Sequence, residues 1–195
     1  DMAKGYVQVY TGAGKGKTTA AIGLAVRSLG AGRKVMMIQF MKSPSYSEHR
    51  ILSSISPNFR LEAVGKPFFI ADEGSIPAED LEKLKDQVVI FPPGNPPADI
   101  VALAQSGLKM AMEAASGGAY DLVILDELNV AMHFGLVSWS EVESIIDAKA
   151  EGTELVITGR NAPKELMDRA DLVTEMREIK HYYSQGVMAR KGIEN

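Results

Sequence analysis

The sequence predicts a protein of the α/β class, in which helices cover both faces of a mostly parallel β-sheet. Short apolar runs alternate along the chain with longer segments whose apolar residues repeat at a helical period. Several runs are apolar at nearly every position, which is typical of strands buried on both faces. A glycine-rich segment lies between the first run and the first helical segment. At 195 residues the chain is long enough to bury one complete core, and we expect a single domain over residues 1–195.

The amino-terminal part of the chain shows this alternation most clearly. Residues 6–10 are β-branched or aromatic at most positions and predict a strand. A helix is expected to begin near Lys17 and to end at Gly30. Its helical period is carried by Ile22, Ala25, Val26 and Leu29. Residues 34–41 then predict a second strand with a continuous apolar centre.

The middle of the chain, residues 43–97, is less regular. We expect a helix over 48–55, a strand over 59–64 and a charged helix over 77–87. A cluster of prolines over 91–97 predicts a loop, and a long amphipathic helix is expected after it over 98–116.

Regular alternation returns in the carboxyl-terminal part. Strands are expected over 120–126, 154–158 and 172–179, and helices over 138–151 and 162–169. In a parallel sheet covered by helices, ligands bind beyond the carboxyl ends of the strands. Functional residues are therefore expected directly after Tyr10, Phe40, Leu125 and Thr158.

The composition argues against several classes of protein. Lys and Arg number 21 against 25 Asp and Glu, and this net charge of −4 argues against nucleic-acid binding through bulk positive charge. The chain has no cysteine, so it has no disulfide, thiolate metal site or cysteine nucleophile. No apolar run approaches the ~18 residues that span a bilayer, and the amino end shows no signal-peptide pattern. We expect a cytoplasmic protein that acts neither on nucleic acid nor in a membrane.

The glycine-rich segment has the features of a phosphate-binding loop. Its glycines let backbone N–H groups turn toward an anion, and the following helix adds its positive dipole end. Lys17 is expected to neutralise phosphate oxygens, and the Thr18 hydroxyl to bind Mg²⁺. The strict motif has glycine where this chain has Thr11, and the alternative is a glycine-rich turn with incidental lysines. The nucleotide-binding residues expected here are Thr11, Gly12, Ala13, Gly14, Lys15, Gly16, Lys17, Thr18 and Thr19. The expected fold is thus a three-layer α/β/α phosphate-loop (RecA-like) domain.

Two consecutive acids lie at the end of the predicted strand over 120–126: Asp126 is its last residue and Glu127 follows it. Mg²⁺, or Mn²⁺ in its place, binds carboxylate and phosphate oxygens, so the expected metal ligands are Thr18, Asp126 and Glu127. A strand that ends in solvated acids is the alternative. Gln39 and Lys42 lie at the end of the second strand and are expected to contact a sugar or phosphate, with solvated loop roles as the alternative. Arg160 follows a later strand and is expected to reach triphosphate or the acceptor molecule.

Several segments together resemble the ATP:corrinoid adenosyltransferase family of vitamin B12 synthesis and salvage. They are YTGAGKGKTTAA (10–21), QFMK (39–42), DELN (126–129), TGRNAP (158–163), ADLVTEM (170–176), KHYY (180–183) and GVMARKGIE (186–194). The resemblance covers well over half of the chain, whereas residues 43–97 match poorly. This chain has Ala13 where the family commonly has Asn, and Ile70 where it has Trp.

The resemblance implies a defined reaction. The 5′-deoxyadenosyl group of ATP is transferred to the Co(I) centre of a reduced corrinoid, and triphosphate is released. No general base is needed, because cobalt supplies the electron pair, and the implied catalytic residues are Lys17, Thr18 and Glu127. Phe68 and Phe69 are expected to pack under the corrin, with two core phenylalanines as the alternative. A homodimer and an electron-donor protein such as a flavodoxin are also implied.

Two other functions stay open on the sequence. One is a phosphate-loop kinase or ATPase with a different acceptor, which would release ADP. The other is a non-catalytic ATP-binding module in which residues 43–97 dock a partner. Within the adenosyltransferase interpretation, cobalamin, cobinamide and cobyrinic acid a,c-diamide are all open as the acceptor.

Overall fold

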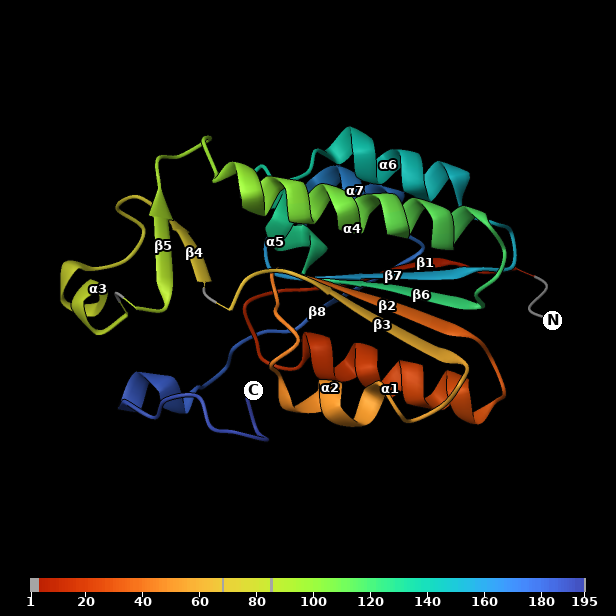
Figure 1. Cartoon of the computed structure of the whole chain (residues 1–195), viewed down its shortest axis with the longest axis horizontal. Coiled ribbons are helices and arrows are strands. Elements are labelled where there is room, and N and C mark those ends of the chain that lie inside the picture. Colours follow the sequence, from red (N-terminus) through yellow and green to blue (C-terminus); the bar gives the residue numbers. More distant parts are fainter. Residues whose placement is uncertain (1–3, 68, 85, 195) are drawn as a thin grey trace.

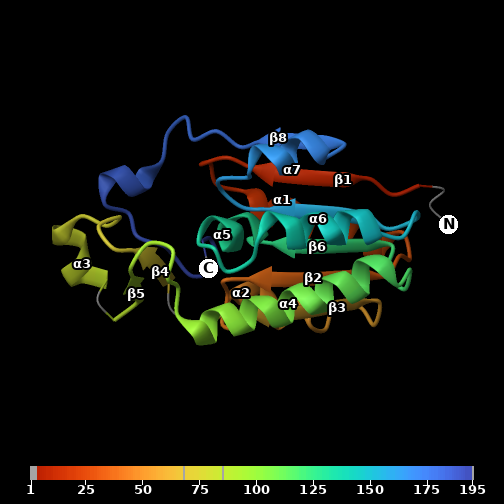
Figure 2. The same cartoon turned by 90° about the horizontal axis from the view of Figure 1, so that it is seen from above.

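A six-stranded parallel β-sheet forms the centre of the molecule, with the strand order β3-β2-β6-β7-β1-β8 (Figure 2). Its strands are β1 (Val7–Thr11), β2 (Val35–Phe40), β3 (Phe59–Val64), β6 (Leu122–Asp126), β7 (Glu154–Thr158) and β8 (Leu172–Glu175). This computed structural model describes residues 4–67, 69–84 and 86–194. The prediction of an α/β fold built on a mostly parallel sheet is confirmed.

Helices cover both faces of the sheet, which gives three layers (Figure 1). One face is covered by α1 (Lys17–Gly30) and α2 (Ser47–Leu52). The other face is covered by α4 (Ala98–Ser116), α5 (Leu128–His133), α6 (Trp139–Ala148) and α7 (Lys164–Arg169). The carboxyl ends of the central strands all point to one edge, toward the carboxyl-terminal tail of the chain.

Successive residues of the central strands belong to two different cores. In β2, Met36 and Ile38 pack into the core beneath α4, whereas Val35 and Met37 pack into the core above α1 with Ala21. All six residues of β2 are buried. This two-sided burial is the physical reason why the strand is apolar at nearly every position.

A second, two-stranded parallel sheet lies beyond the carboxyl edge of the central one (Figure 1). It consists of β4 (Phe69–Asp72) and β5 (Val88–Phe91), which are connected through α3 (Ala78–Leu84). Ile70 and Phe91 join the large core together with Ile100 of α4. This small sheet is therefore anchored at the start of α4.

Most expected elements are present, and the predicted bounds 59–64, 98–116 and 154–158 agree with the structure. The last strand is shorter than expected over 172–179, because β8 ends at Glu175. Beyond it, the Met176 N–H donates to the Thr11 carbonyl (2.8 Å) and the Met176 carbonyl accepts from the Gly14 N–H (2.7 Å). The chain here packs on the glycine-rich loop and leaves the sheet. The sequence analysis did not predict β4, β5, α5 or the short 3₁₀ helix η1 (Tyr182–Gln185).

The helices in the described ranges include none that combines the length and the apolar character required to cross a bilayer.

Candidate active site

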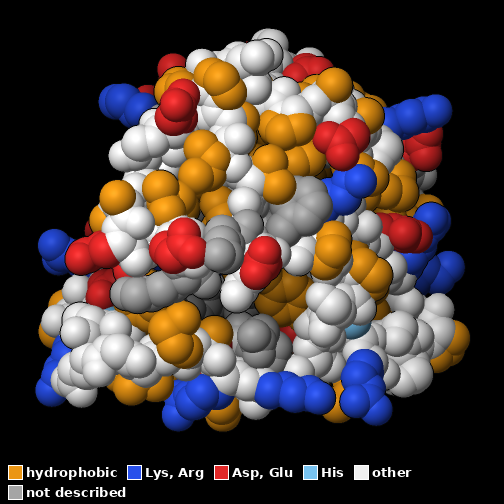
Figure 3. Space-filling model, turned by 60° about the vertical axis from the view of Figure 1, so that its left-hand side comes forward, with side chains coloured by type: hydrophobic (Ala, Val, Ile, Leu, Met, Phe, Trp, Pro, Cys, Tyr) orange, Lys and Arg blue, Asp and Glu red, His pale blue; other side chains and the backbone are white. Residues whose placement is uncertain are grey.

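A cavity of about 910 Å³ opens at the edge where the central strands end. Its walls come from the loop between β1 and α1, from residues that follow β2, β6 and β7, and from the carboxyl-terminal tail. Figure 3 shows this side of the molecule, with Lys and Arg side chains along its lower margin and hydrophobic side chains gathered higher up. The predicted site residues in the lining are Ala13, Gly14, Lys15, Gly16, Lys17, Thr18, Thr19, Lys42, Phe69, Glu127 and Arg160.

Other predicted site residues do not line this cavity. Thr11, Gln39 and Asp126 are buried side chains outside its lining, and Gly12 is likewise not part of it. Phe68 lies outside the described residues. The structure therefore brings the glycine-rich loop, Lys42, Glu127 and Arg160 together, and places a second set of polar residues behind them.

The glycine-rich loop wraps around the ammonium group of Lys17. Lys17 Nζ donates to the carbonyls of Gly12 (2.8 Å) and Gly14 (2.7 Å), and the residue is only 7% exposed. Burial, and then the positive charge of Arg160, lower the pKa of this ammonium group, while Glu127 and Asp126 oppose the shift. The loop thus holds a positive charge at the start of α1. This charge and the backbone N–H groups there both attract an anion.

The loop requires glycine because the chain after β8 lies against it. Gly12 has φ +99°, and a Cβ atom there would lie 2.4 Å from the Met176 carbonyl oxygen. A Cβ atom on Gly14 would lie 2.7 Å from the same oxygen. The glycines therefore serve the packing of β8 on the loop as well as the loop's own turn.

The Asp126 carboxylate accepts hydrogen bonds from four side chains on three segments of the chain. Oδ1 accepts from the hydroxyls of Thr18 (2.9 Å) and Thr158 (2.7 Å), and Oδ2 accepts from Gln39 Nε2 (3.2 Å) and Lys42 Nζ (3.0 Å). Asp126 is completely buried. Burial by itself would lower the pKa of Lys42, but the attraction of Asp126 outweighs it and the pKa is raised. Asp126 therefore orients Thr18 and Lys42 toward the cavity and is itself enclosed.

Glu127 is the acid that faces the cavity. It has a left-handed backbone conformation (φ 62°), and its N–H donates to the Thr158 hydroxyl (3.0 Å). This conformation turns the chain sharply between β6 and α5, so that consecutive acids take different directions. Burial, and then the negative charge of Asp126, raise the pKa of the Glu127 carboxyl, with Lys42, Lys17 and Arg160 opposing.

The turn after β7 brings Arg160 to the cavity. The side-chain amide of Asn129 donates to the Gly159 carbonyl (2.9 Å). A Cβ atom on Gly159, where φ is +130°, would lie 2.9 Å from Asn129 Cβ, so α5 and this turn are in close contact. Asn129 is fully buried, and its Oδ1 atom has no hydrogen-bond partner among the described residues. Asn129 therefore positions the segment that carries Arg160.

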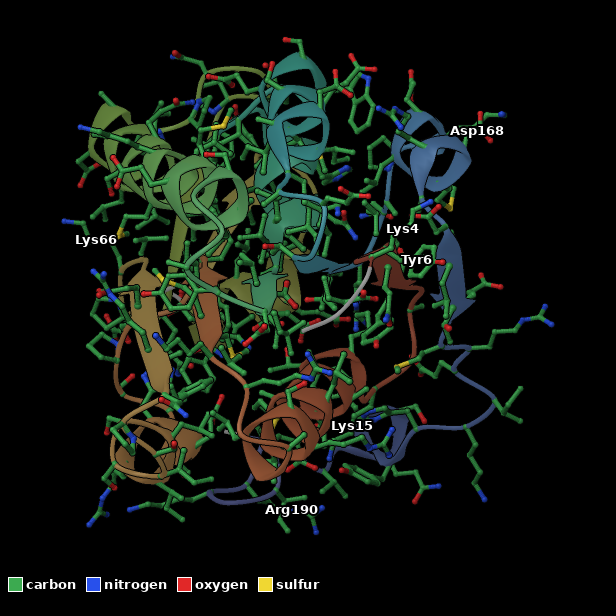
Figure 4. All side chains as sticks on the ribbon, turned by 90° about the vertical axis from the view of Figure 1, so that its right-hand side faces the viewer. Lys4, Tyr6, Lys15, Lys66, Asp168 and Arg190 are labelled. Atoms are coloured by element: carbon green, nitrogen blue, oxygen red, sulfur yellow. The ribbon has the colours of Figure 1, made fainter. Side chains whose placement is uncertain are left out.

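Sequence reasoning assigned no role to the carboxyl-terminal tail, which closes one side of the cavity. Lys15 Nζ donates to the Ile193 carbonyl (3.1 Å) and to Glu194 Oε1 (3.3 Å). Glu194 also accepts from the Arg190 N–H (2.8 Å) and from the Tyr182 hydroxyl. Hydrogen bonds from Arg190 and Tyr182 lower the pKa of the Glu194 carboxyl. Figure 4 shows Lys15 and Arg190 on the α1 side of the sheet. The only signal in the sequence was that residues 186–194 belong to the family resemblance.

A second cavity of about 470 Å³ adjoins the first. Both cavities share a wall made of Met41, Tyr46, Ser47, Phe69 and Ala189. Phe69 is 59% exposed, which is unusual for a phenylalanine in a core and is typical of a residue that contacts a ligand or partner. The shared wall makes the two cavities neighbouring parts of one site.

The residues present suit a hard divalent cation beside phosphate. The Thr18 hydroxyl donates its proton to Asp126 and accepts from Lys42 Nζ (3.2 Å), which leaves one lone pair for a cation. The Glu127 carboxylate lies in the lining of the same cavity. Hydroxyl, carboxylate and phosphate oxygens are the ligands that Mg²⁺ prefers. In the described ranges, no group of at least three His, Asp or Glu side chains forms a metal site of its own. Thr18 and Glu127 therefore offer some of the oxygen ligands of Mg²⁺, and phosphate oxygens of a nucleotide would supply others.

Comparison with known proteins supports a specific family. The family model described as ATP:corrinoid adenosyltransferase BtuR/CobO/CobP matches residues 3–195. A corrinoid adenosyltransferase of Pseudomonas aeruginosa is 30% identical, with 98% of this chain and 84% of that protein aligned. One from a Sinorhizobium species is 32% identical, with 98% and 80% aligned. Corrinoid adenosyltransferase CobA of Salmonella typhimurium is 31% identical, with 98% and 86% aligned.

Proposed function

This chain belongs to the ATP:corrinoid adenosyltransferase family, and from that premise we propose that it transfers the 5′-deoxyadenosyl group of ATP to a reduced corrinoid. One observation carries the proposal: a cavity built on a phosphate loop shares a wall with a second cavity. A nucleotide and a separate acceptor molecule would meet across that wall.

The bond changes in the proposed reaction define what the protein must do. The Co(I) centre of the corrinoid donates an electron pair to the ribose C5′ carbon, and a cobalt–carbon bond forms. The bond from C5′ to the triphosphate oxygen breaks, and triphosphate leaves with the electron pair. Cobalt is oxidised from Co(I) to Co(III). No proton is transferred at the reacting atoms, so the protein must align C5′ with cobalt and stabilise the leaving group.

The cationic side chains of the loop fit the second task. Lys17 is held among the loop carbonyls, and Lys15 and Arg160 face the same cavity. Together with the backbone N–H groups at the start of α1, they would balance the charge that develops on triphosphate. These groups are held by the protein itself: the loop carbonyls hold Lys17, the carboxyl-terminal tail holds Lys15, and Asn129 holds the turn that carries Arg160.

We assign Mg²⁺, or Mn²⁺ in its place, to the Thr18 hydroxyl and the Glu127 carboxylate, with Asp126 oriented behind Thr18. The metal ion would supply further positive charge to the triphosphate oxygens. Both residues already line the cavity, and one Thr18 lone pair is left for the metal ion, because the hydroxyl donates to Asp126 and accepts from Lys42 Nζ (3.2 Å).

The second cavity is proposed to hold the corrinoid. Phe69, Met41 and Tyr46 give the shared wall apolar and aromatic surface, which suits a flat macrocycle and keeps water from a reactive metal centre. Family membership further supports a homodimer and an electron-donor protein, such as a flavodoxin, as partners. We place the reaction in the cytoplasm, where ATP and reducing partners are both present.

An anaerobic assay tests the proposal. Protein, ATP, Mg²⁺ and chemically reduced cobalamin or cobinamide are mixed, and both the spectrum and the phosphate products are measured. We expect a light-sensitive cobalt–carbon product with one triphosphate released for each molecule formed. Lys17→Ala should lower kcat by about 10²–10³-fold, because a donor aimed at the leaving group is lost.

Lys109→Ala is the matched control, since Lys109 is an exposed lysine of α4 outside both cavities. Release of ADP in place of triphosphate would support a kinase or ATPase. Binding of ATP with no product from either corrinoid would support a non-catalytic module.

A further inference from the structure

His49 is a buried histidine of α2 that lies behind the two cavities. It is 7% exposed, and it is absent from the described residues that line either cavity. Its Nε2 atom contacts the Oε1 atom of Gln39, a fully buried residue of β2. The imidazole is thus joined to the polar network around Asp126, although it cannot itself touch a ligand in the cavities.

The direction of the hydrogen bond between His49 and Gln39 follows from the groups around Gln39. The Asp126 carboxylate accepts hydrogen bonds, so the amide group that faces its Oδ2 atom at 3.2 Å is the Gln39 NH₂. The Gln39 Oε1 atom then faces His49, and a carboxamide oxygen can only accept. His49 therefore carries a hydrogen on Nε2 and donates it to Gln39.

His49 also holds the segment that forms the shared wall of the cavities. Its backbone N–H donates to the Tyr46 carbonyl (3.1 Å), and the centroids of the His49 and Tyr46 rings are 6.2 Å apart. Tyr46 lines both cavities, and Lys42 Nζ lies 5.3 Å from the centroid of its ring. One buried residue therefore connects the shared wall with the network behind the first cavity.

The position of Lys42 depends on this network. Lys42 Nζ donates to Asp126 Oδ2 (3.0 Å), which is the same oxygen that accepts from Gln39, and to the Thr18 hydroxyl (3.2 Å). Without the donor on His49, Gln39 Oε1 would be buried with a lost hydrogen bond, which is unfavourable. Gln39 is then expected to change its side-chain conformation, and Asp126 to lose the donor that holds Oδ2 beside Lys42.

Resting on the function proposed above, we propose that His49 is a positioning residue for adenosyl transfer. It acts on Lys42 through Gln39 and Asp126, and on the shared wall through Tyr46, so that the triphosphate and the acceptor are held in one relative geometry. His49 contacts neither substrate. Its loss should therefore slow the transfer step more than it weakens the binding of ATP.

Two substitutions of His49 in the anaerobic assay test this role. His49→Leu removes the donor, whereas His49→Gln keeps an N–H donor at a similar distance from the backbone. We expect His49→Leu to lower kcat about fivefold to tenfold, the effect of one lost buried hydrogen bond, and to change KM for ATP less than about twofold. His49→Gln should retain most of the wild-type kcat.

A double-mutant cycle tests whether His49 acts through Gln39. Gln39→Leu should lower kcat by a similar factor, and the double variant should lose no more than either single variant, because the two residues form one chain of hydrogen bonds. Losses that multiply in the double variant overturn the inference. Equal losses of kcat in His49→Leu and His49→Gln also overturn it, because the donor would then have no special role.

Ser53→Ala is the control that separates positioning from the stability of α2. The Ser53 hydroxyl donates to the His49 carbonyl (2.6 Å), so this variant loosens the end of α2 and leaves the imidazole contact in place. We expect a lower Tm and an unchanged kcat. A loss of kcat in Ser53→Ala as large as that in His49→Leu overturns the inference, because any loosening of α2 would then suffice.

Nitrogen NMR of protein with ¹⁵N-labelled histidine and lysine gives a readout that needs no turnover. The His49 signals, assigned by their loss in His49→Gln, should show a hydrogen on Nε2 in the wild type. The Lys42 ammonium signal, assigned with Lys42→Arg, should shift in His49→Leu and not in Ser53→Ala. An Nε2 atom without a hydrogen overturns the inference even where His49→Leu does not fold, and so does a Lys42 signal that His49→Leu leaves unchanged.

The two readouts separate this inference from the proposed function. If wild type turns over neither cobalamin nor cobinamide, the proposed function fails, and the NMR signals still decide whether His49 positions Lys42. If wild type is active and His49→Leu keeps its kcat, the positioning role is overturned and the adenosyltransferase function stands.

Discussion

Asp126 connects the side chains that line the cavity with the buried polar side chains behind them. A carboxylate has about four lone-pair sites for donors, and Thr18, Thr158, Gln39 and Lys42 occupy them. Behind it, Gln39 Oε1 contacts His49 Nε2, so the network continues to α2. The side chains that face the cavity are thus held in place before any ligand binds, which reduces the reorganisation needed for transfer.

The charged carboxylate of Glu127, the next residue, is expected to lower the free energy of unfolding. Glu127→Gln removes the repulsion from Asp126 and the penalty of a buried charge, the two causes of its raised pKa. We expect this variant to be more stable by about 1 kcal/mol, with a Tm about 2–4 °C higher, and to have lower adenosylation activity at saturating Mg²⁺. Thermal unfolding and the anaerobic assay measure the two effects.

The sign of the pH dependence follows from that shift. A carboxyl group whose pKa is higher in the folded state destabilises the protein only where the unfolded form ionises, at a pH above about 4.3. The extra stability of Glu127→Gln should therefore be absent below that pH and grow as the pH rises. Glu151→Gln, an exposed acid elsewhere, should show no such trend. Equal or lower stability of Glu127→Gln at neutral pH would contradict this account.

At the scale of elements, α4 approaches the sheet closely because one of its residues is glycine. A Cβ atom on Gly107 would lie 2.7 Å from Val64 Cγ2 and 2.9 Å from Phe40 Cε1. These contacts join α4 to the ends of β2 and β3, which are the strands that lead into both cavities. The depth at which α4 packs therefore influences where Met41 and Lys42 lie.

Two glycine-to-alanine substitutions distinguish the effect of this close packing on stability from the effect of helix propensity. Gly107→Ala gains about 1 kcal/mol of propensity but overpacks the core by about 1–3 kcal/mol, so we expect a net loss of stability. Gly23→Ala in α1 meets nothing within 4 Å and should stabilise the protein by about 0.5–1 kcal/mol. Urea unfolding of both variants measures the difference. If both substitutions stabilise the protein, α4 can move away from the sheet without loss of stability, and the prediction for Gly107→Ala is wrong.

At the scale of the whole molecule, the carboxyl-terminal tail contacts the glycine-rich loop near the amino-terminal end of the chain. Glu194 and Lys15 are 179 residues apart in sequence and 3.3 Å apart in the structure. The Glu194 carboxylate offers Lys15 the kind of oxygen that a phosphate would offer. If Lys15 binds triphosphate as proposed, triphosphate and the tail compete for this lysine, and binding of ATP exchanges one anionic partner for another.

Glu194→Gln should consequently tighten ATP binding by about twofold to fivefold, the effect expected of one exposed ion pair. Isothermal titration with ATP and Mg²⁺ measures the change. Glu178→Gln, an exposed acid outside both cavities, is the matched control. Weaker ATP binding in Glu194→Gln would contradict competition, and would indicate that Glu194 instead orders the tail around the nucleotide.

The sequence by itself determined the features that are encoded within one contiguous segment. Residues 11–19 are predicted to bind phosphate because the segment is rich in glycine and lies between a strand and a helix, as the structure confirms for β1 and α1. The central strands were predictable because burial on both faces leaves an uninterrupted apolar run, as in β2. The same local rules located Asp126 and Glu127 at the end of β6.

Only the tertiary structure decided how distant segments meet. No local pattern distinguishes enclosed Asp126 from Glu127 at the cavity, because a left-handed turn at Glu127 separates them. The four-residue strands β4 and β5 are too short for a periodic signal, and their burial arises from packing at the start of α4. The contact of Glu194 with Lys15 likewise follows from the path of the whole chain. Periodicity and backbone requirements act over a few residues, whereas the charge and shape of the two cavities depend on the packing of every layer.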